Sequence, residues 1–153
     1  MALTIHRGEL DKRDVQELLA SHVAAMHSHS PPEACHVLPA ERLRDDTITF
    51  FSAREGGRLL AIGALKALGG GAGEIKSMRT RADALRRGAA SAILRAIVVE
   101  ARARGYERLL LETGSGQEFA AAIALYGRAG FTPCEPFGGY PGGPFTRFMA
   151  LDL

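Results

Sequence analysis

The sequence predicts a single mixed α/β domain over residues 1–153, in which helices flank one mixed sheet of the α+β kind. Short apolar or alternating runs typical of strands are interspersed with segments whose apolar residues recur every three or four positions, as in amphipathic helices. The chain is 46% hydrophobic and 24% charged, which is ordinary for a globular protein, and its 153 residues suffice for one core. We find no internal repeat, linker or low-complexity segment that divides it.

The first segment of the chain predicts a strand and a helix. Residues 2–6 alternate apolar and polar side chains, which is typical of a short strand. After Asp11 the pattern becomes helical, and the helix is expected to end at Pro31 and Pro32, because proline cannot continue a helix. Its apolar face consists of Val15, Leu18, Leu19, His22 and Met26. Residues 33–44 predict a short helical or irregular segment.

A hairpin and a third strand are expected next. Residues 47–54 alternate in polarity, and the glycine-containing turn 55–58 leads into a return strand over 59–68. The glycine-rich stretch 69–73 predicts a flexible connection, and residues 74–80 predict the following strand.

The clearest helical pattern in the chain begins after residues 86–90 and is expected to end at Gly105. Its apolar face consists of Ala90, Ile93, Leu94, Ile97, Val98 and Ala101. Residues 109–113 predict a strand, and the continuous apolar run with which they begin is expected of a central strand. Ser115 and Glu118 have the spacing of a capping box and predict a helix that ends near Gly130. The last two strands are expected at residues 131–134 and 146–151, with a Gly/Pro-rich loop at 137–144 between them.

Composition and charge exclude several classes of function. The net charge of +2 and the lack of basic–aromatic interleaving argue against a nucleic-acid binder, and no apolar run approaches membrane-spanning length. Cys35 and Cys134 fit no metal spacing and are expected to be reduced, which favours the cytoplasm. The histidines that crowd one region lack the carboxylate spacing of a metal site. They are His22, His27, His29 and His36.

Residues 86–90, Arg-Arg-Gly-Ala-Ala, predict a phosphate site. They connect a strand to the first turn of a helix, where backbone N–H groups are free and small residues allow close approach. Flanking arginines add charge-assisted contacts. The absence of G-x-G-x-x-G excludes a dinucleotide fingerprint, and Lys76 does not directly follow a glycine as a P-loop lysine does. The alternative is a tight turn with solvated arginines.

Three further side chains each have a functional and a structural interpretation. Tyr126 is either a catalytic acid or a core tyrosine on the inner face of its helix. Glu74, at the start of a central strand, is either a partly buried general base or a solvated carboxylate, and Glu112 on the neighbouring strand has the same ambiguity.

Together these segments resemble the GNAT (Gcn5-related N-acetyltransferase) superfamily over nearly the whole chain. Residues 85–90 resemble its coenzyme A loop, (Gln/Arg)-x-x-Gly-x-(Gly/Ala), although Leu85 departs from the polar first position. Residues 125–131, Leu-Tyr-Gly-Arg-Ala-Gly-Phe, resemble its Leu-Tyr-x-x-x-Gly-Phe element. Glu74 lies fourteen residues before Gly88, similar to the base glutamate of some members. Segments 74–80, 111–115 and 30–33 look like those of a bacterial YsnE-like subgroup.

The resemblance implies a mostly antiparallel sheet whose central strands splay apart to hold acetyl-CoA. The residues it places at this cofactor are Met78, Arg79, Thr80, Arg86, Arg87, Gly88, Ala89, Ala90, Ser91, Ser115 and Phe119. The backbone N–H of Met78 is the implied oxyanion donor. Tyr126 is implied as the acid and Glu74 as the base, with Glu33 or His36 in reserve. Glu33, His36 and Tyr140 are implied to contact the acceptor.

The resulting expectation is a cytoplasmic bacterial acyltransferase that moves an acetyl group directly from acetyl-CoA to a primary amine of a small molecule or peptide. No metal, nucleic acid or membrane is expected to take part, and a homodimer is compatible with the family. The alternatives are a non-catalytic acyl-CoA sensor or an interaction domain. The sequence leaves the acceptor and the acyl-chain length open.

Overall fold

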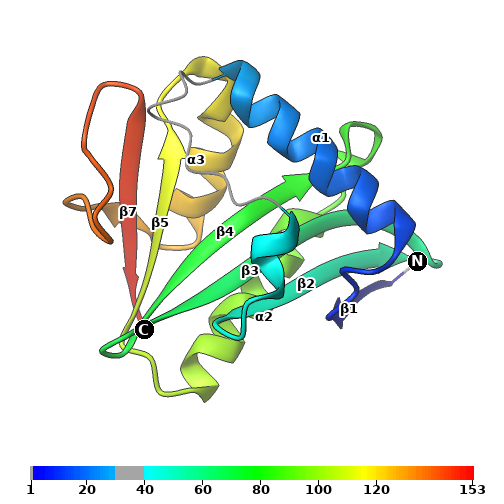
Figure 1. The fold of residues 1–153 in the computed structure, drawn as a ribbon, viewed down its shortest axis with the longest axis horizontal. Helices are drawn as coiled ribbons and strands as arrows, with labels where there is room; N and C mark the ends of the chain where they lie inside the picture. Colours follow the sequence, from blue (N-terminus) through cyan, green and yellow to red (C-terminus); the bar gives the residue numbers. More distant parts are fainter. Residues whose placement is uncertain (1, 30–39) are drawn as a thin grey trace.

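A computed structural model describes residues 2–29 and 40–153. Within these residues one seven-stranded sheet has the order β1-β2-β3-β4-β5-β7-β6, and three α-helices pack on it (Figure 1). The strands are β1 (Leu3–Arg7), β2 (Ile48–Glu55), β3 (Arg58–Gly69), β4 (Ala72–Thr80), β5 (Arg108–Gly114), β6 (Thr132–Pro133) and β7 (Thr146–Asp152). The helices are α1 (Arg13–His29), α2 (Ala89–Ala103) and α3 (Ala120–Arg128), with 3-10 turns η2 (Ala40–Arg44), η3 (Ala82–Ala84) and η4 (Gln117–Phe119). The predicted element order is confirmed.

The centre of the sheet is split. β4 and β5 form the parallel pair, which runs from Ala72 opposite Arg108 to Ile75 opposite Leu111, and the other neighbouring strands are antiparallel. Beyond Ile75 and Leu111 the two strands continue without pairing and diverge (Figure 1). The predicted mostly antiparallel sheet with splayed central strands is therefore confirmed, and we call this divergence the split.

Each face of the sheet carries its own core. On one face, α2 and α3 bury apolar side chains against the central strands, among them Ile93 and Ile97 of α2 packed with Leu65 and Leu111. On the other face, α1 and η2 bury Val15, Leu18, Leu19 and Leu43 against Phe50 and Ile62. We call these the α2 face and the α1 face. Successive strand residues alternate between them, so a strand position fixes which helix a side chain meets.

Two expectations about connections are wrong. Gly70 and Gly71 are not part of a flexible connection, because they form a two-residue turn between β3 and β4 with φ of 63° and 78°. Positive φ at both positions is the geometry of a tight hairpin turn and suits glycine. Ser115 does not cap a helix, since its hydroxyl donates to the Pro144 carbonyl and α3 begins only at Ala120.

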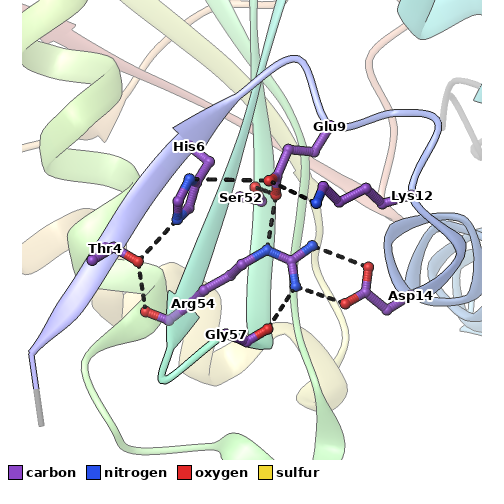
Figure 2. A network of polar contacts seen from close by, with 8 residues as sticks. All are labelled: Thr4, His6, Glu9, Lys12, Asp14, Ser52, Arg54 and Gly57. Carbon is purple, nitrogen blue, oxygen red and sulfur yellow. Dashed lines mark hydrogen bonds and ion pairs between the residues drawn. The ribbon is translucent and has the colours of Figure 1, made fainter.

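A buried arginine joins α1 to β2, the strand next to the edge strand β1 (Figure 2). The Arg54 guanidinium donates to Glu9 Oε1 at 2.9 Å, to both Asp14 carboxylate oxygens at 2.7 and 3.0 Å, and to the Gly57 carbonyl at 2.9 Å. Such a pre-organised fork satisfies several acceptors at once. The network fixes the first turn of α1 against β2 and so sets where the helix crosses the sheet. No helix in the described part of the chain is long and apolar enough to cross a membrane.

Candidate functional site

The N-terminus of α2 presents unused backbone donors. Gly88 is its N-cap residue with φ of 80°, no side chain caps the helix, and its first turn contains no acidic residue. The first bond into the helix runs from the Ala92 N–H to the Gly88 carbonyl at 3.0 Å, so the N–H groups of residues 89–91 have no intrahelical acceptor. Together with the helix dipole, these groups favour an anion.

The residues of the predicted phosphate loop lie together at this helix end. Arg86 and Arg87 are exposed, and Arg86 has the unusual positive φ of 65°. The Arg87 guanidinium forms an ion pair with Glu55 at 3.0 Å, which anchors the loop to the turn after β2. The side chain of Ala89 points into the α2-face core, and Ser91 is half-buried. The loop thus has both backbone N–H groups and two guanidinium groups, Arg86 and Arg87, that can bind an anion.

A backbone irregularity marks β4 just beyond the point where the split begins. Ser77 has φ of 58°, and the β3–β4 register shifts between Ile62 and Ala64. Two residues of β4 therefore oppose one of β3, which is a β-bulge. Met78 follows the bulge and packs beside Gly63 and Ile93 on the α2 face. The predicted cofactor strand Met78–Thr80 therefore lies along the unpaired part of β4.

Glu74, Lys76 and Tyr140 form a hydrogen-bonded unit on the α1 face where the split begins. The side chains of Glu74 and Lys76 are only 3% and 7% exposed, and the Lys76 Nζ lies 3.1 Å from Glu74 Oε2. The Lys76 Nζ donates to the Tyr140 hydroxyl at 2.7 Å, and that hydroxyl donates to Glu74 Oε2 at 3.0 Å. Burial, followed by the charge and hydrogen bond of Glu74 and the charge of Glu112, raises the pKa of Tyr140. Its phenol therefore stays protonated at neutral pH.

Tyr126 lies on α3 within the α2-face core and is 6% exposed. Its ring meets Phe131 edge-on, with centroids 5.8 Å apart. Burial raises the pKa of its hydroxyl, so this tyrosine also keeps its proton at neutral pH. It is thus on the opposite face of the sheet from the unit of Glu74, Lys76 and Tyr140.

The remaining predicted contacts divide into those the structure places and those it does not. The Phe119 ring is 7% exposed and fills the space beside Gly114 at the end of β5, where a β-carbon on Gly114 would lie 2.1 Å from it. Ser115 directly follows Gly114, and its hydroxyl donates to the Pro144 carbonyl in the loop before β7. Glu33 and His36 lie outside the described residues. Within the described residues no group of three or more His, Cys, Asp or Glu side chains is arranged to hold a metal.

A separate cavity of about 420 Å³ lies between α1 and η3. Its lining includes the carboxylates of Asp14, Glu17 and Asp83 together with Arg81. Three carboxylates disfavour a phosphate group there. The α2 N-terminus is therefore the better anion site in this region.

Sequence reasoning missed two features of the site. From the sequence, Lys76 is considered only as a P-loop lysine. Lys76 is two residues after Glu74, however, so both side chains lie on the same face of the strand. Its contact with Tyr140 joins residues 64 positions apart and leaves no local signal. His22, which the sequence puts on the apolar face of its helix, is buried at 4% exposure, with the Arg79 charge near it.

Comparisons with known proteins agree with this arrangement. The family model described as the Acetyltransferase (GNAT) family matches residues 14–131. The chain is 47% identical to the uncharacterized N-acetyltransferase YedL of Escherichia coli K12 over 150 residues, 98% of this chain and 94% of YedL. It is 49% identical to the uncharacterized N-acetyltransferase YsnE of Bacillus subtilis 168 over 145 residues, 95% and 96% of the two chains. A B. subtilis acetyltransferase solved in complex with CoA shares the fold, with a TM-score of 0.74, 16% identity and 99% coverage of both chains.

Proposed function

The chain belongs to the GNAT family of acetyltransferases and is an acyltransferase, and from that premise we propose that it transfers an acetyl group from acetyl-CoA directly to a primary amine of a small molecule or peptide. The observation that carries the proposal is the free N-terminus of α2 beside the split. A cofactor with a pyrophosphate and an extended arm needs both an anion site and a strand edge. The α2 N-terminus and the part of β4 beyond its pairing with β5 support this proposal, since Met78 and Ile93 of α2 both lie beside Gly63.

The residues present fit acetyl-CoA. An ideal β-carbon on Gly88 meets nothing within 4 Å, so the space in front of the α2 N-terminus is open. We assign the pyrophosphate to the N–H groups of residues 87–91, with Arg86 and Arg87 as flanking cations. The backbone of residues 78–80 is assigned to the pantetheine arm, and Ser115 with Phe119 to the opposite wall. When bound, acetyl-CoA supplies the activated acyl carbonyl and a thiol leaving group.

The chain's own groups supply the acid–base chemistry in this proposal. The Glu74 carboxylate accepts a proton from the acceptor ammonium, either directly or through the Tyr140 hydroxyl that it already binds, so that the amine becomes a nucleophile. The backbone N–H of Met78, turned by the bulge at Ser77, is assigned as the donor to the developing oxyanion. Tyr126 keeps a proton at neutral pH and is assigned as the acid for the leaving sulfur. Glu33 and His36 remain reserve bases.

The first test of this proposal is a thermal shift with acetyl-CoA, CoA, ATP and NAD measured side by side. A ligand that binds the folded state at 100 times its Kd stabilises it by about 2.7 kcal/mol, which a melting curve resolves. We expect acetyl-CoA and CoA to raise Tm while ATP and NAD at the same concentration do not. Absence of a shift with both CoA species would overturn the proposal.

A screen of primary amines with release of free CoA as the signal then tests the transfer itself. We expect at least one amine to accelerate CoA release above the rate in buffer, with a new acetylated product visible by mass spectrometry. Binding of acetyl-CoA without turnover of any amine, amino acid or peptide N-terminus in the panel would instead support a non-catalytic acyl-CoA sensor.

A further inference from the structure

The unit formed by Glu74, Lys76 and Tyr140 joins the two halves of the sheet on its α1 face. Glu74 pairs with Leu110 in the last paired stretch of β4 and β5, whereas Lys76 comes one residue after the final pair, Ile75 and Leu111. Lys76 is therefore the first residue of the split on this face. Tyr140 comes from the loop before β7, on the other side of the split. Its hydroxyl thus bridges a gap that no backbone ladder closes.

Aromatic packing fixes the Tyr140 ring from its own side. Its centroid lies 5.7 Å from that of Phe137 and 6.3 Å from that of Phe148 on β7. The Phe137 and Phe148 rings are themselves 5.6 Å apart and meet edge-on. These contacts seat the ring, but they leave its hydroxyl end to be placed by polar groups.

Lys76 is a polar group placed to do this together with Glu74. Its Nζ contacts the Tyr140 hydroxyl and Glu74 Oε2, and it lies 5.2 Å from the Tyr140 ring centroid. The hydroxyl accepts from Lys76 and donates to Glu74, so the direction of its proton is set by the ammonium. A buried carboxylate also needs a cation, because desolvation without one is costly.

We propose that Lys76 is a positioning residue of the transferase site, which locks the Tyr140 hydroxyl and the Glu74 carboxylate into one unit across the mouth of the split. This inference rests on the proposed function. It deepens that function by naming the residue that holds the proposed base, Glu74, and the proposed acceptor contact, Tyr140, in one arrangement. Lys76 itself neither accepts nor donates the transferred proton.

The test is a Lys76→Met variant, which keeps the length and apolar stem of the side chain and removes its charge. Its first readout needs no substrate and is the ¹³Cζ resonance of Tyr140, assigned among the three tyrosines with a Tyr140→Phe variant. We expect this resonance to shift or broaden while the Kd for CoA stays within about twofold of the wild type. With an amine that the wild type acetylates, we expect kcat to fall at least about tenfold with an unchanged KM for acetyl-CoA.

A matched control separates positioning from loss of stability. Arg54→Met likewise removes a buried cation, one that binds the carboxylates of Glu9 and Asp14, but on β2 as drawn in Figure 2. We expect it to lower Tm while leaving the Tyr140 resonance and kcat as in the wild type. If Lys76→Met does not fold, the double variant Glu74→Gln/Lys76→Met replaces it, because no unpaired buried charge remains. Its Tyr140 resonance should differ from that of the Glu74→Gln single variant, and equal resonances in the two would overturn the inference.

An unchanged Tyr140 resonance in the folded Lys76 variant, or a kcat equal to that of the wild type, would overturn the inference. Equal loss of kcat in Arg54→Met would also overturn it, because the effect would then be one of stability. Failure of the wild type to bind CoA would count against the proposed function instead. The NMR readout would still show whether Lys76 holds Tyr140.

Discussion

Tyr126 illustrates how a side chain of the core can also serve the acid chemistry that we propose for it. Its ring belongs to the α2-face core and packs edge-on against Phe131, which immediately follows the turn that ends α3. Burial raises the pKa of its hydroxyl, so the group holds its proton where an exposed tyrosine would lose it more readily. The core interpretation and the acid interpretation are therefore compatible, since packing fixes the ring and burial preserves the proton.

Replacing Tyr126 with phenylalanine tests the acid role alone, because the ring and its packing stay. We expect kcat to fall by about 10²-fold while the Kd for acetyl-CoA and Tm remain near the wild-type values. Steady-state kinetics with the amine found in the screen and calorimetric titration of CoA measure the two effects. Full retention of kcat would remove Tyr126 from the acid role and leave it as a core residue.

How far the sequence predicts the site depends on whether a residue's partners are local. Gly88 and Tyr126 lie in short motifs whose spacing predicts a role for each, and they lie at the N-cap of α2 and in the core. The pairing of Lys76 with Tyr140 depends on a loop that folds back over β7, so no local pattern predicts it. The capping box expected at Ser115 is absent for the same reason. The Ser115 hydroxyl donates instead to the carbonyl of Pro144, which is distant in sequence.

At the scale of elements, α2 links the core to the proposed anion site. Its apolar stripe, Ile93, Leu94, Ile97 and Ala101, is buried and holds the helix against the sheet. That packing aims the helix N-terminus, with its unused N–H groups and positive dipole end, toward the unpaired part of β4. The periodicity of α2 is strong enough to predict both its buried face and its start. The split itself follows from where the β4–β5 ladder stops, which only the three-dimensional pairing reveals.

The two ends of α2 provide a matched test of the anion site. Gly88 and Gly105 have φ of 80° and 76°, and a β-carbon at either meets nothing within 4 Å. A side chain at either position therefore carries a similar backbone strain of roughly 1–2 kcal/mol. We expect Gly88→Glu to abolish acetyl-CoA binding through bulk and negative charge, and Gly105→Glu to bind normally, both measured by calorimetry. Normal binding by a folded Gly88→Glu protein would contradict the assigned loop.

At the scale of the whole molecule, two cores of different size share one sheet, and α1 covers the smaller one. The Arg54 network fixes the start of α1 over β2, and His22 lies buried further along the helix, near Arg79 of β4. Hydrogen bonding from Arg54 lowers the pKa of Asp14 against the opposing effect of burial. This contribution to stability is present above the ordinary Asp pKa and is lost only as pH falls through the lowered value. A pH below the lowered pKa of Asp14 should therefore weaken the attachment of the start of α1 to β2.

His22 makes the stability of the whole domain depend on pH in a higher range. Burial, with a smaller effect of the Arg79 charge, lowers the pKa of His22 from 6.5 to about 4. Between these values the unfolded chain binds a proton that the folded chain excludes, so the free energy of unfolding falls as pH falls. We expect this group to cost about 2 kcal/mol between pH 7 and pH 5. Urea unfolding of the wild type and of His22→Leu at both pH values measures the difference.

The His22→Leu variant should lose about 2 kcal/mol less than the wild type over that interval, because its buried side chain has no proton to bind. Carboxylates such as Glu9 and Asp14 titrate in both proteins, so their contribution cancels in the comparison. His27 lies exposed on the same helix, and His27→Gln is the matched control that should keep the wild-type pH dependence. Equal pH dependence in the wild type and His22→Leu would mean that the folded chain accommodates a charged His22. The contact of α1 with β4 would then be looser than the burial of this side chain indicates.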